Sequence, residues 1–155
     1  MLRTLSAALL LAVLSSAPAA AQTTGCPVEE PTNPALQPVV DQINALRKTA
    51  GVAPLALNTL LTKAAQGHAD DMARNNYFSH TSRDGRSAGQ RITAAGYSWS
   101  SWAENIAWGQ ADWAAVVRGW TNSAGHRANM LNPRYRDIGL GVSNRKYVAN
   151  FASPR

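Results

Sequence analysis

The spacing of apolar residues predicts two long helices in the first half of the folded region. Between Asn33 and Gly51, apolar residues recur at every third or fourth position, as they do on one face of an α-helix. Asn33 and Pro34 suit the start of this helix, because asparagine is a good cap and proline fits the first turn. A second helix is predicted from Asn58 to Asn75–Asn76. Its inward face comprises Leu61, Ala64, Ala65, His68, Ala69 and Met72, and a histidine in such a stripe is more typical of a core or cap than of a ligand.

The second half of the chain mixes helical and alternating patterns. The predicted segments, in chain order, are a loop over 79–86 with a turn at Asp84–Gly85, a short helix over 87–95, an irregular or partly extended stretch over 97–109, a helix capped by Asp112 and ending near Ser123, and two strands over 138–142 and 147–151 joined by a turn at Ser143–Asn144. Helices that flank a small antiparallel sheet indicate an α+β fold.

The first 21 residues have the pattern of a secretory signal peptide. A basic start containing Arg3 precedes the apolar run Leu5–Leu14, and the small residues Ala19–Ala21 precede Gln22. The apolar run is about half of the ~20 residues that a membrane-spanning helix needs. We therefore expect cleavage before Gln22, no transmembrane segment, and a protein that is secreted or periplasmic.

Residues 22–34 are predicted to be a linker, and residues 35–155 a single domain. Three prolines, Pro27, Pro31 and Pro34, leave the linker without a periodic apolar face. Cys26 is the only cysteine of the chain, so an intrachain disulfide is excluded. A free thiol, a disulfide-linked dimer and a lipid attachment remain open. The polar run Thr23–Gly25 before the cysteine is unfavourable for lipidation, so we interpret Cys26 as a free thiol in a monomer.

The chain is basic, which favours anionic partners. The formal net charge is +6 at pH 7, and removal of Arg3 with the signal peptide lowers it to +5. An exported basic protein is attracted to phospholipid head groups, lipopolysaccharide or wall polymers, although the charge could serve solubility alone. Nucleic acid is not expected as a partner, because the basic residues are scattered and no nucleic-acid-binding motif occurs.

Three polar residues, His80, Glu104 and His126, lie within segments that are otherwise rich in apolar or helix-forming residues. These segments, together with Trp120–Pro133 and Asp137–Val142, resemble the signature of the CAP superfamily, which includes cysteine-rich secretory proteins, antigen 5 and plant pathogenesis-related 1 proteins. The resemblance extends from about Leu36 to Phe151 and is closest to short bacterial secreted members. It implies a three-layer α-β-α sandwich.

The resemblance also implies a polar cleft lined by two histidines and two glutamates. His80 and His126 match the histidines and Glu104 matches the first glutamate, whereas Ser123 stands where the second glutamate is expected. Asn105 and Asn129 are expected beside them, Asn129 being one helical turn after His126. Two imidazoles could hold a divalent ion such as Zn²⁺ weakly, with Glu104 orienting one ring, but catalytic zinc usually has three protein ligands.

Several functions are compatible with these residues. The favoured hypothesis is a non-enzymatic exported domain that binds an amphipathic lipid or envelope ligand in the cleft; the main alternative is a metal-dependent, protease-like hydrolase using His80, Glu104 and His126. The same residues could instead only organise the fold. An interaction module acting through Arg134 and Arg136 is a third possibility.

A serine hydrolase using Ser79, Ser82 or Ser123 is disfavoured, because none lies in a Gly-x-Ser-x-Gly motif. The five tryptophans could form a ligand-binding floor, but core and rim packing is more usual.

Overall fold

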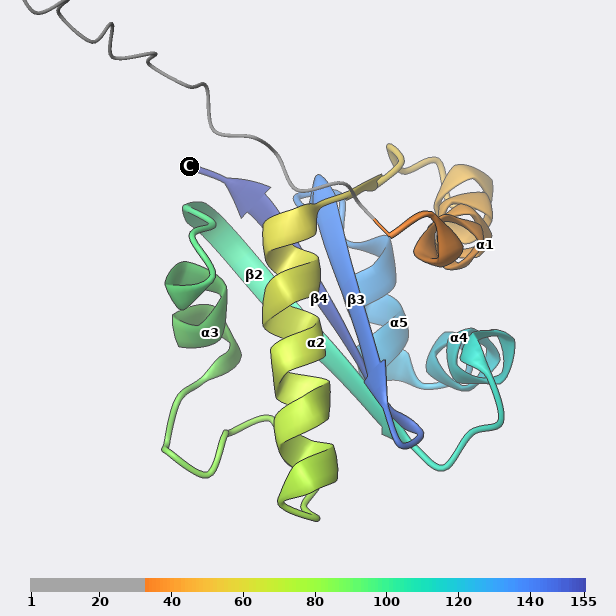
Figure 1. Cartoon of the computed structure of the whole chain (residues 1–155). Helices are drawn as coiled ribbons and strands as arrows, with labels where there is room; N and C mark the ends of the chain where they lie inside the picture. Colours follow the sequence, from red (N-terminus) through yellow and green to blue (C-terminus); the bar gives the residue numbers. More distant parts are fainter. Residues whose placement is uncertain (1–32) are drawn as a thin grey trace, which may run out of the picture.

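A computed structural model describes residues 33–155, which form a four-stranded sheet between two layers of helices (Figure 1). The predicted signal peptide, Cys26 and almost all of the predicted linker lie outside the described residues. The elements, in chain order, are the 3₁₀-helix η1 (Pro34–Leu36), α1 (Gln37–Thr49), β1 (Ala56–Leu57), α2 (Thr59–Arg74), α3 (Ala88–Ala94), β2 (Trp99–Trp108), α4 (Trp113–Thr121), α5 (Ala124–Leu131), β3 (Asp137–Ser143) and β4 (Lys146–Pro154). The predicted α+β class and three-layer arrangement are confirmed.

The strand order in the sheet is β1-β3-β4-β2, so the long strand β2 lies at one edge. Strands β3 and β4 form the predicted antiparallel hairpin, and β2 pairs with β4 in the antiparallel sense. The two-residue strand β1 pairs with β3 in parallel and was not predicted. The stretch over 97–109, predicted to be irregular or partly extended, is extended over most of its length, because β2 pairs with β4 from Trp99 to Trp108. Helices cover both faces of β2, and every residue from Ala103 to Ala107 is buried. This strand therefore lacks the alternation of polar and apolar residues that identifies a half-exposed strand.

Helices α2 and α3 cover one face of the sheet, and α1, α4 and α5 cover the other (Figure 1). The larger core cluster lies on the second face, where α1 and α4 meet Leu140 and Phe151 of the sheet. Two smaller clusters lie beneath α2 and α3. Within residues 33–155, no helix has both the length and the apolar character needed to cross a lipid bilayer.

Two glycines of β3 allow α2 to lie directly on the sheet. A Cβ atom added to Gly139 would be 2.0 Å from the main-chain carbon of Leu61, and one added to Gly141 would be 2.3 Å from the main-chain nitrogen of Gln66. No side chain fits in either place. The Gly-x-Gly pattern of β3 therefore fixes the distance between α2 and the sheet.

Most helix limits follow from the capping residues that the sequence contains. The Asn58 side chain accepts hydrogen bonds from the backbone N–H groups of Leu60 and Leu61, and all six residues of the predicted α2 stripe are buried. Asp112 caps α4, which ends at Thr121. Helix α5 then begins after only two residues, Asn122 and Ser123, and had not been predicted as a separate element.

The β3–β4 hairpin turns one residue later than predicted. Asn144 and Arg145, rather than Ser143 and Asn144, occupy the turn, and both have positive φ angles (45° and 54°). Positive φ at both central residues is the geometry of a type I′ turn, which matches the twist of the paired strands.

Candidate functional site

Glu104 is a buried carboxylate with three hydrogen-bonding partners. Its side chain is 1% exposed, and it accepts hydrogen bonds from Arg91 Nη2 at 2.6 Å and from His80 Nδ1 at 2.8 Å. Asn150, opposite Glu104 on β4, donates to Oε2 at 3.3 Å when its amide is oriented to satisfy both of its polar atoms. Both carboxylate oxygens are therefore engaged within the protein.

Arg91 joins Glu104 to the loop that carries His80. From α3, its Nη1 donates to the main-chain oxygens of His80 and Arg86 and to Ser82 Oγ, each at 3.0 Å. The residue is buried, and the ion pair fixes the position of His80 from both its main chain and its ring. Sequence reasoning missed Arg91. The available signal was its position beside Ile92 on the inward face of a short helix, where an unpaired arginine would be unfavourable.

Asn105, the next residue of β2, forms its side-chain hydrogen bonds on the opposite face of the sheet. It is fully buried; its amide nitrogen donates to the main-chain oxygen of His126 at 3.0 Å, and its amide oxygen accepts from Asn129 at 2.8 Å. Asn129 thus bonds to Asn105 and not to the His126 ring. The two asparagines attach α5 to the edge strand.

His126 projects from α5 and is half-buried. Its Nδ1 is 2.9 Å from Ser123 Oγ, and its ring lies against that of Trp120, with 6.1 Å between centroids. Burial, and to a smaller extent the charge of His80, lowers the pKa of His126, so the ring is neutral at pH 7. His80 comes from the α2–α3 layer and His126 from the α1–α4–α5 layer.

The two histidines offer a limited set of metal ligands. Each ring has its Nδ1 engaged, His80 with Glu104 and His126 with Ser123, and in the described part of the chain neither Nε2 has a hydrogen-bond partner. No group of three or more His, Cys, Asp or Glu side chains within residues 33–155 is arranged to hold a metal ion. Two imidazole nitrogens suit a weak, exchangeable ion completed by water, and they are one donor short of the usual catalytic zinc site.

The serines near the histidines do not complete a nucleophilic triad. Ser82 accepts from Arg91, and Ser79 Oγ accepts from the main-chain N–H of Thr81. Ser123 contacts His126, but the carboxylate of Glu104 contacts the other histidine, His80. Serine–histidine and histidine–carboxylate pairs therefore exist on different histidines, which does not match the relay of a serine hydrolase.

His68 is a core residue, as predicted. It is 1% exposed, and its Nε2 is 2.8 Å from the main-chain oxygen of Ser79. The Nε2–H tautomer donates to this carbonyl, which leaves Nδ1 buried without a hydrogen-bond partner among the described residues. Burial, followed by the charge of Arg91, lowers the pKa of His68.

The tryptophans do not form a common floor. Trp120 is buried and Trp113 packs against it, with 6.2 Å between ring centroids. Trp99 and Trp102 contact each other edge to face at the α3–β2 rim, and Trp108 is largely exposed. Core and rim packing thus accounts for four of the five.

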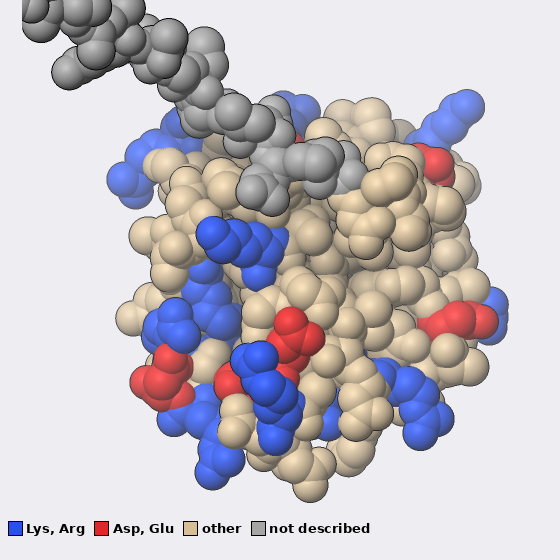
Figure 2. Space-filling model, in the orientation of Figure 1, with Lys and Arg blue, Asp and Glu red and all other residues tan. Residues whose placement is uncertain are grey.

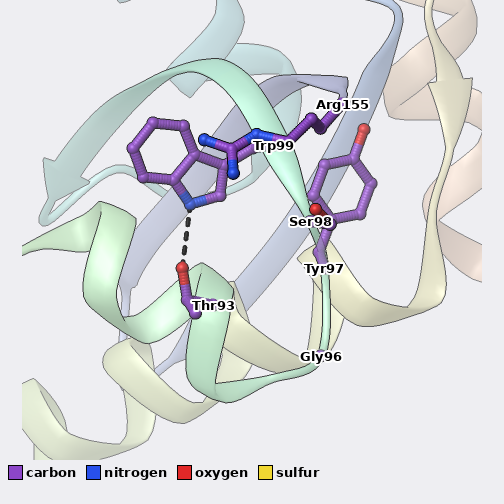
Figure 3. Close-up of a pocket in the computed structure, with 6 residues that line it drawn as sticks. All are labelled: Thr93, Gly96, Tyr97, Ser98, Trp99 and Arg155. Atoms are coloured by element: carbon purple, nitrogen blue, oxygen red, sulfur yellow. Dashed lines mark hydrogen bonds between the residues drawn. The ribbon is translucent and has the colours of Figure 1, made fainter.

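The rim contains a small hollow beside Trp99 (Figure 3). Its volume is about 250 Å³, and it is lined by Thr93, Gly96, Tyr97, Ser98, Trp99 and Arg155. The Trp99 indole N–H donates to Thr93 Oγ1 at 2.9 Å, which fixes the ring as one wall. None of the predicted site residues lines this hollow.

Comparisons with known proteins agree with this architecture. The sequence matches the cysteine-rich secretory protein family (CAP) over residues 40–151. It is 38% identical to each of two Bacillus subtilis (strain 168) proteins. The match to the uncharacterized membrane protein YlbC covers 73% of this chain and 33% of that protein. The match to the uncharacterized protein YkwD covers 82% of this chain and 50% of that protein. A 1.5 Å crystal structure of an extracellular protein containing an SCP domain, from Bacillus anthracis strain Ames, superposes with a TM-score of 0.73 at 36% identity, covering 75% of this chain and 39% of that one. The chain thus spans a third to a half of the relatives' lengths.

Proposed function

This chain belongs to the cysteine-rich secretory protein (CAP) family, and we propose that it is an exported, non-catalytic member that binds the polar head of an amphipathic lipid or another envelope ligand through His80 and His126. The extracellular SCP-domain protein of Bacillus anthracis supports export as part of this proposal. We assign the binding role to His80 and His126 because of how their imidazole rings are held.

The orientation of the imidazoles is the observation that carries the proposal. A partner at Nδ1 fixes each ring, Glu104 at 2.8 Å for His80 and Ser123 at 2.9 Å for His126. A neutral ring whose Nδ1–H donates to a carboxylate has an unprotonated Nε2, which accepts a hydrogen bond or binds a metal ion. His80 is 58% exposed at its side chain, so its outer edge can be reached from solvent.

The state of Glu104 favours binding over hydrolysis. A general base must reach the proton that it removes, within about 3 Å or through one water. Glu104 is buried and its two oxygens are held by Arg91 and His80, so it acts on the orientation of His80 and not on a substrate. A metal-dependent hydrolase would have to do without this carboxylate.

A weakly bound divalent ion is compatible with the same pair of histidines. His80 and His126 would hold it through two nitrogens, with Glu104 orienting the His80 ring. The ion would supply positive charge for an anionic head group. We propose zinc as the probe for this site because imidazole nitrogen is among its preferred ligands.

Native mass spectrometry of the protein purified from the envelope fraction of its own host tests the proposal. The wild-type protein should retain an added mass of lipid size, and His80→Ala/His126→Ala should lose it. Arg83→Ala, an exposed change in the same loop as His80, should retain it. Absence of any bound mass in the wild type, or a hydrolytic activity that chelator and His126→Ala both abolish, would refute a non-catalytic binding role.

A further inference from the structure

Two aromatic side chains face solvent at one end of the molecule. Trp108 is 58% exposed and Phe78 is 40% exposed, and their rings are 6.0 Å apart with a tilt of 37°. Trp108 ends β2, and Phe78 follows the C-terminal end of α2, at the lower end in Figure 1. Large apolar groups grouped on a surface commonly mark an interaction site. Leu60, also exposed (36%), lies at the opposite end of α2.

Basic residues belong to the elements that end beside the aromatic pair. Lys146 is opposite Trp108 in the β2–β4 register and is buried (2% exposed), with its Nζ 5.1 Å from the centre of the indole ring, so it supports the ring and is not itself presented to solvent. Arg145 occupies the adjoining hairpin turn, where its main-chain oxygen accepts from the N–H of Gly109 at 2.9 Å. Arg74 is exposed in the last turn of α2. The aromatic pair, the exposed Arg145 and Arg74, and the buried Lys146 that contacts the indole are called the aromatic–basic end below.

Asp71, an acidic residue at this end, uses both of its carboxylate oxygens in hydrogen bonds within the protein. Asp71, near the C-terminal end of α2, accepts from Asn75 at 2.7 Å through one oxygen and from the Tyr77 hydroxyl through the other. The domain as a whole is also basic. Of the 15 Lys and Arg and the 9 Asp and Glu of the chain, Arg3, Glu29 and Glu30 lie outside residues 33–155, which leaves 14 positive and 7 negative residues. Lys and Arg outnumber Asp and Glu on the face shown in Figure 2.

We propose that the aromatic–basic end is a docking surface for an anionic lipid bilayer. Tryptophan is favoured at membrane interfaces, because its ring is apolar while its indole N–H remains near the head groups. Lysine and arginine next to such anchors are attracted to the negative surface potential of anionic lipids. The end therefore combines the two kinds of side chain that peripheral membrane contact requires.

The arrangement of the rings argues against a flat platform for a sugar. The tilt between Phe78 and Trp108 and the position of Lys146 over the indole leave no shared flat face. Docking is independent of the ligand proposed for the histidines. Phe78 is nevertheless only two residues before His80, so a docked domain would hold that histidine near the lipid surface.

Co-sedimentation with vesicles tests the proposal, using the protein as its native host processes it. The wild type should bind vesicles of equal parts phosphatidylcholine and phosphatidylglycerol, and high salt should weaken this binding. Trp108→Ala and Phe78→Ala should each lower the partition coefficient about tenfold, because each removes an exposed aromatic anchor. Leu60→Ala is the matched control and should bind like the wild type.

The outcomes separate this proposal from that for the histidines. The double variant His80→Ala/His126→Ala should still bind these vesicles. If it does not, vesicle binding depends on the histidines and the aromatic–basic end is not a separate docking surface. Equal binding to pure phosphatidylcholine would overturn the anionic preference. Wild-type binding by both aromatic variants, or capture of a protein partner at Trp108 without any vesicle binding, would overturn membrane docking. Melting temperatures near that of the wild type would show that the variants are folded.

Discussion

Glu104 and Asn105 are consecutive residues of the edge strand β2, and their side chains attach opposite helix layers to it. Glu104 bonds to Arg91 of α3 and to His80 on the α2–α3 side, whereas Asn105 bonds to the main chain of His126 and to Asn129 of α5. Successive side chains of a strand point to opposite faces, so a Glu-Asn pair reaches both layers. The pair thereby places one histidine from each layer at the same edge of the sheet.

The buried ion pair should be essential for stability. Arg91→Met leaves the Glu104 carboxylate in the interior without its arginine, and breaking a buried pair in this way costs about 3–5 kcal/mol. Arg86→Ala is the control, since the Arg86–Asp84 pair is exposed and its loss should leave the free energy of unfolding nearly unchanged. Chemical denaturation measures both. Equal losses for the two variants would mean that the buried pair has no special role.

Gly139 should tolerate no side chain. A Cβ atom 2.0 Å from the Leu61 main chain forces α2 away from the sheet, so Gly139→Ala should destabilise the domain by about 3 kcal/mol or more. Gly67→Ala, on α2 itself, meets no atom within 4 Å and should stabilise the helix by about 0.5–1 kcal/mol. Thermal denaturation of the two variants should therefore shift in opposite directions. A neutral Gly139→Ala would show that α2 can move freely over β3.

Trp120 should be the most costly tryptophan to remove. It is buried on α4, and its indole N–H donates to the main-chain oxygen of Ile106 at 3.3 Å. Trp120→Ala should cost roughly 3–5 kcal/mol. Trp108→Ala, at the exposed end of β2, should cost far less. Urea denaturation of both variants checks the difference, and similar midpoints would contradict the assignment of Trp120 to the core.

The structural features that could be predicted from the sequence are those set by residues close together along the chain. The cap at Asn58 and the α2 stripe are local features, so α2 was placed to within a residue at each end. Strand β2 was predicted only as an irregular or partly extended stretch, because its polar residues Glu104 and Asn105 are buried by partners distant in sequence and no periodic pattern records that burial. For the same reason Arg91 was overlooked. Its role depends on a carboxylate thirteen residues away and on a loop folded back over α3.

Motif resemblance predicted the members of the site better than their roles. Glu104 was expected within hydrogen-bond reach of one of the two histidines, and it bonds to His80 at 2.8 Å. Asn129 was expected on the same side as His126, where it would orient that ring or satisfy a loop, and its amide bonds to Asn105. The spacing of residues predicts which face of a helix or strand a side chain occupies. It does not predict which of two nearby polar groups that side chain will bond to, because this depends on side-chain geometry.

Acid should destabilise the protein through two histidines. The folded state lowers the pKa of His68 and of His126, in both cases mainly through burial, whereas the unfolded chain titrates near its ordinary ~6.5. Below that pH the unfolded state binds protons that the folded state does not, so the free energy of unfolding falls with decreasing pH through the folded pKa values. Above pH ~6.5 these two histidines are neutral in both states, so they add no pH dependence to the free energy of unfolding. Denaturation curves between about pH 7.5 and pH 5 measure the slope, which should become shallower in His68→Gln and in His126→Gln. An unchanged slope in both variants would assign the acid sensitivity to other groups.

Zinc binding should depend on both histidines and on their protonation. Calorimetry should detect one weak site in the wild type and none in His80→Ala/His126→Ala. Because an imidazole must be neutral to bind a metal ion, the affinity should fall as the pH drops through ~6.5. Unchanged binding in the double variant would place the ion elsewhere.

The difference between the two histidine partners suggests how the site could be strengthened. A carboxylate orients His80, whereas the hydroxyl of Ser123 occupies the corresponding place at His126. Ser123→Glu would give His126 a carboxylate partner as well and add negative charge, both of which favour a bound cation. Zinc affinity should therefore increase. Asn122→Glu adds the same charge one residue earlier, at the exposed end of α4 and without the contact to His126, so it should increase affinity much less. Equal gains in the two variants would indicate that general charge attraction, and not orientation of the ring, limits binding. No gain in Ser123→Glu would argue that the His126 ring does not bind the ion.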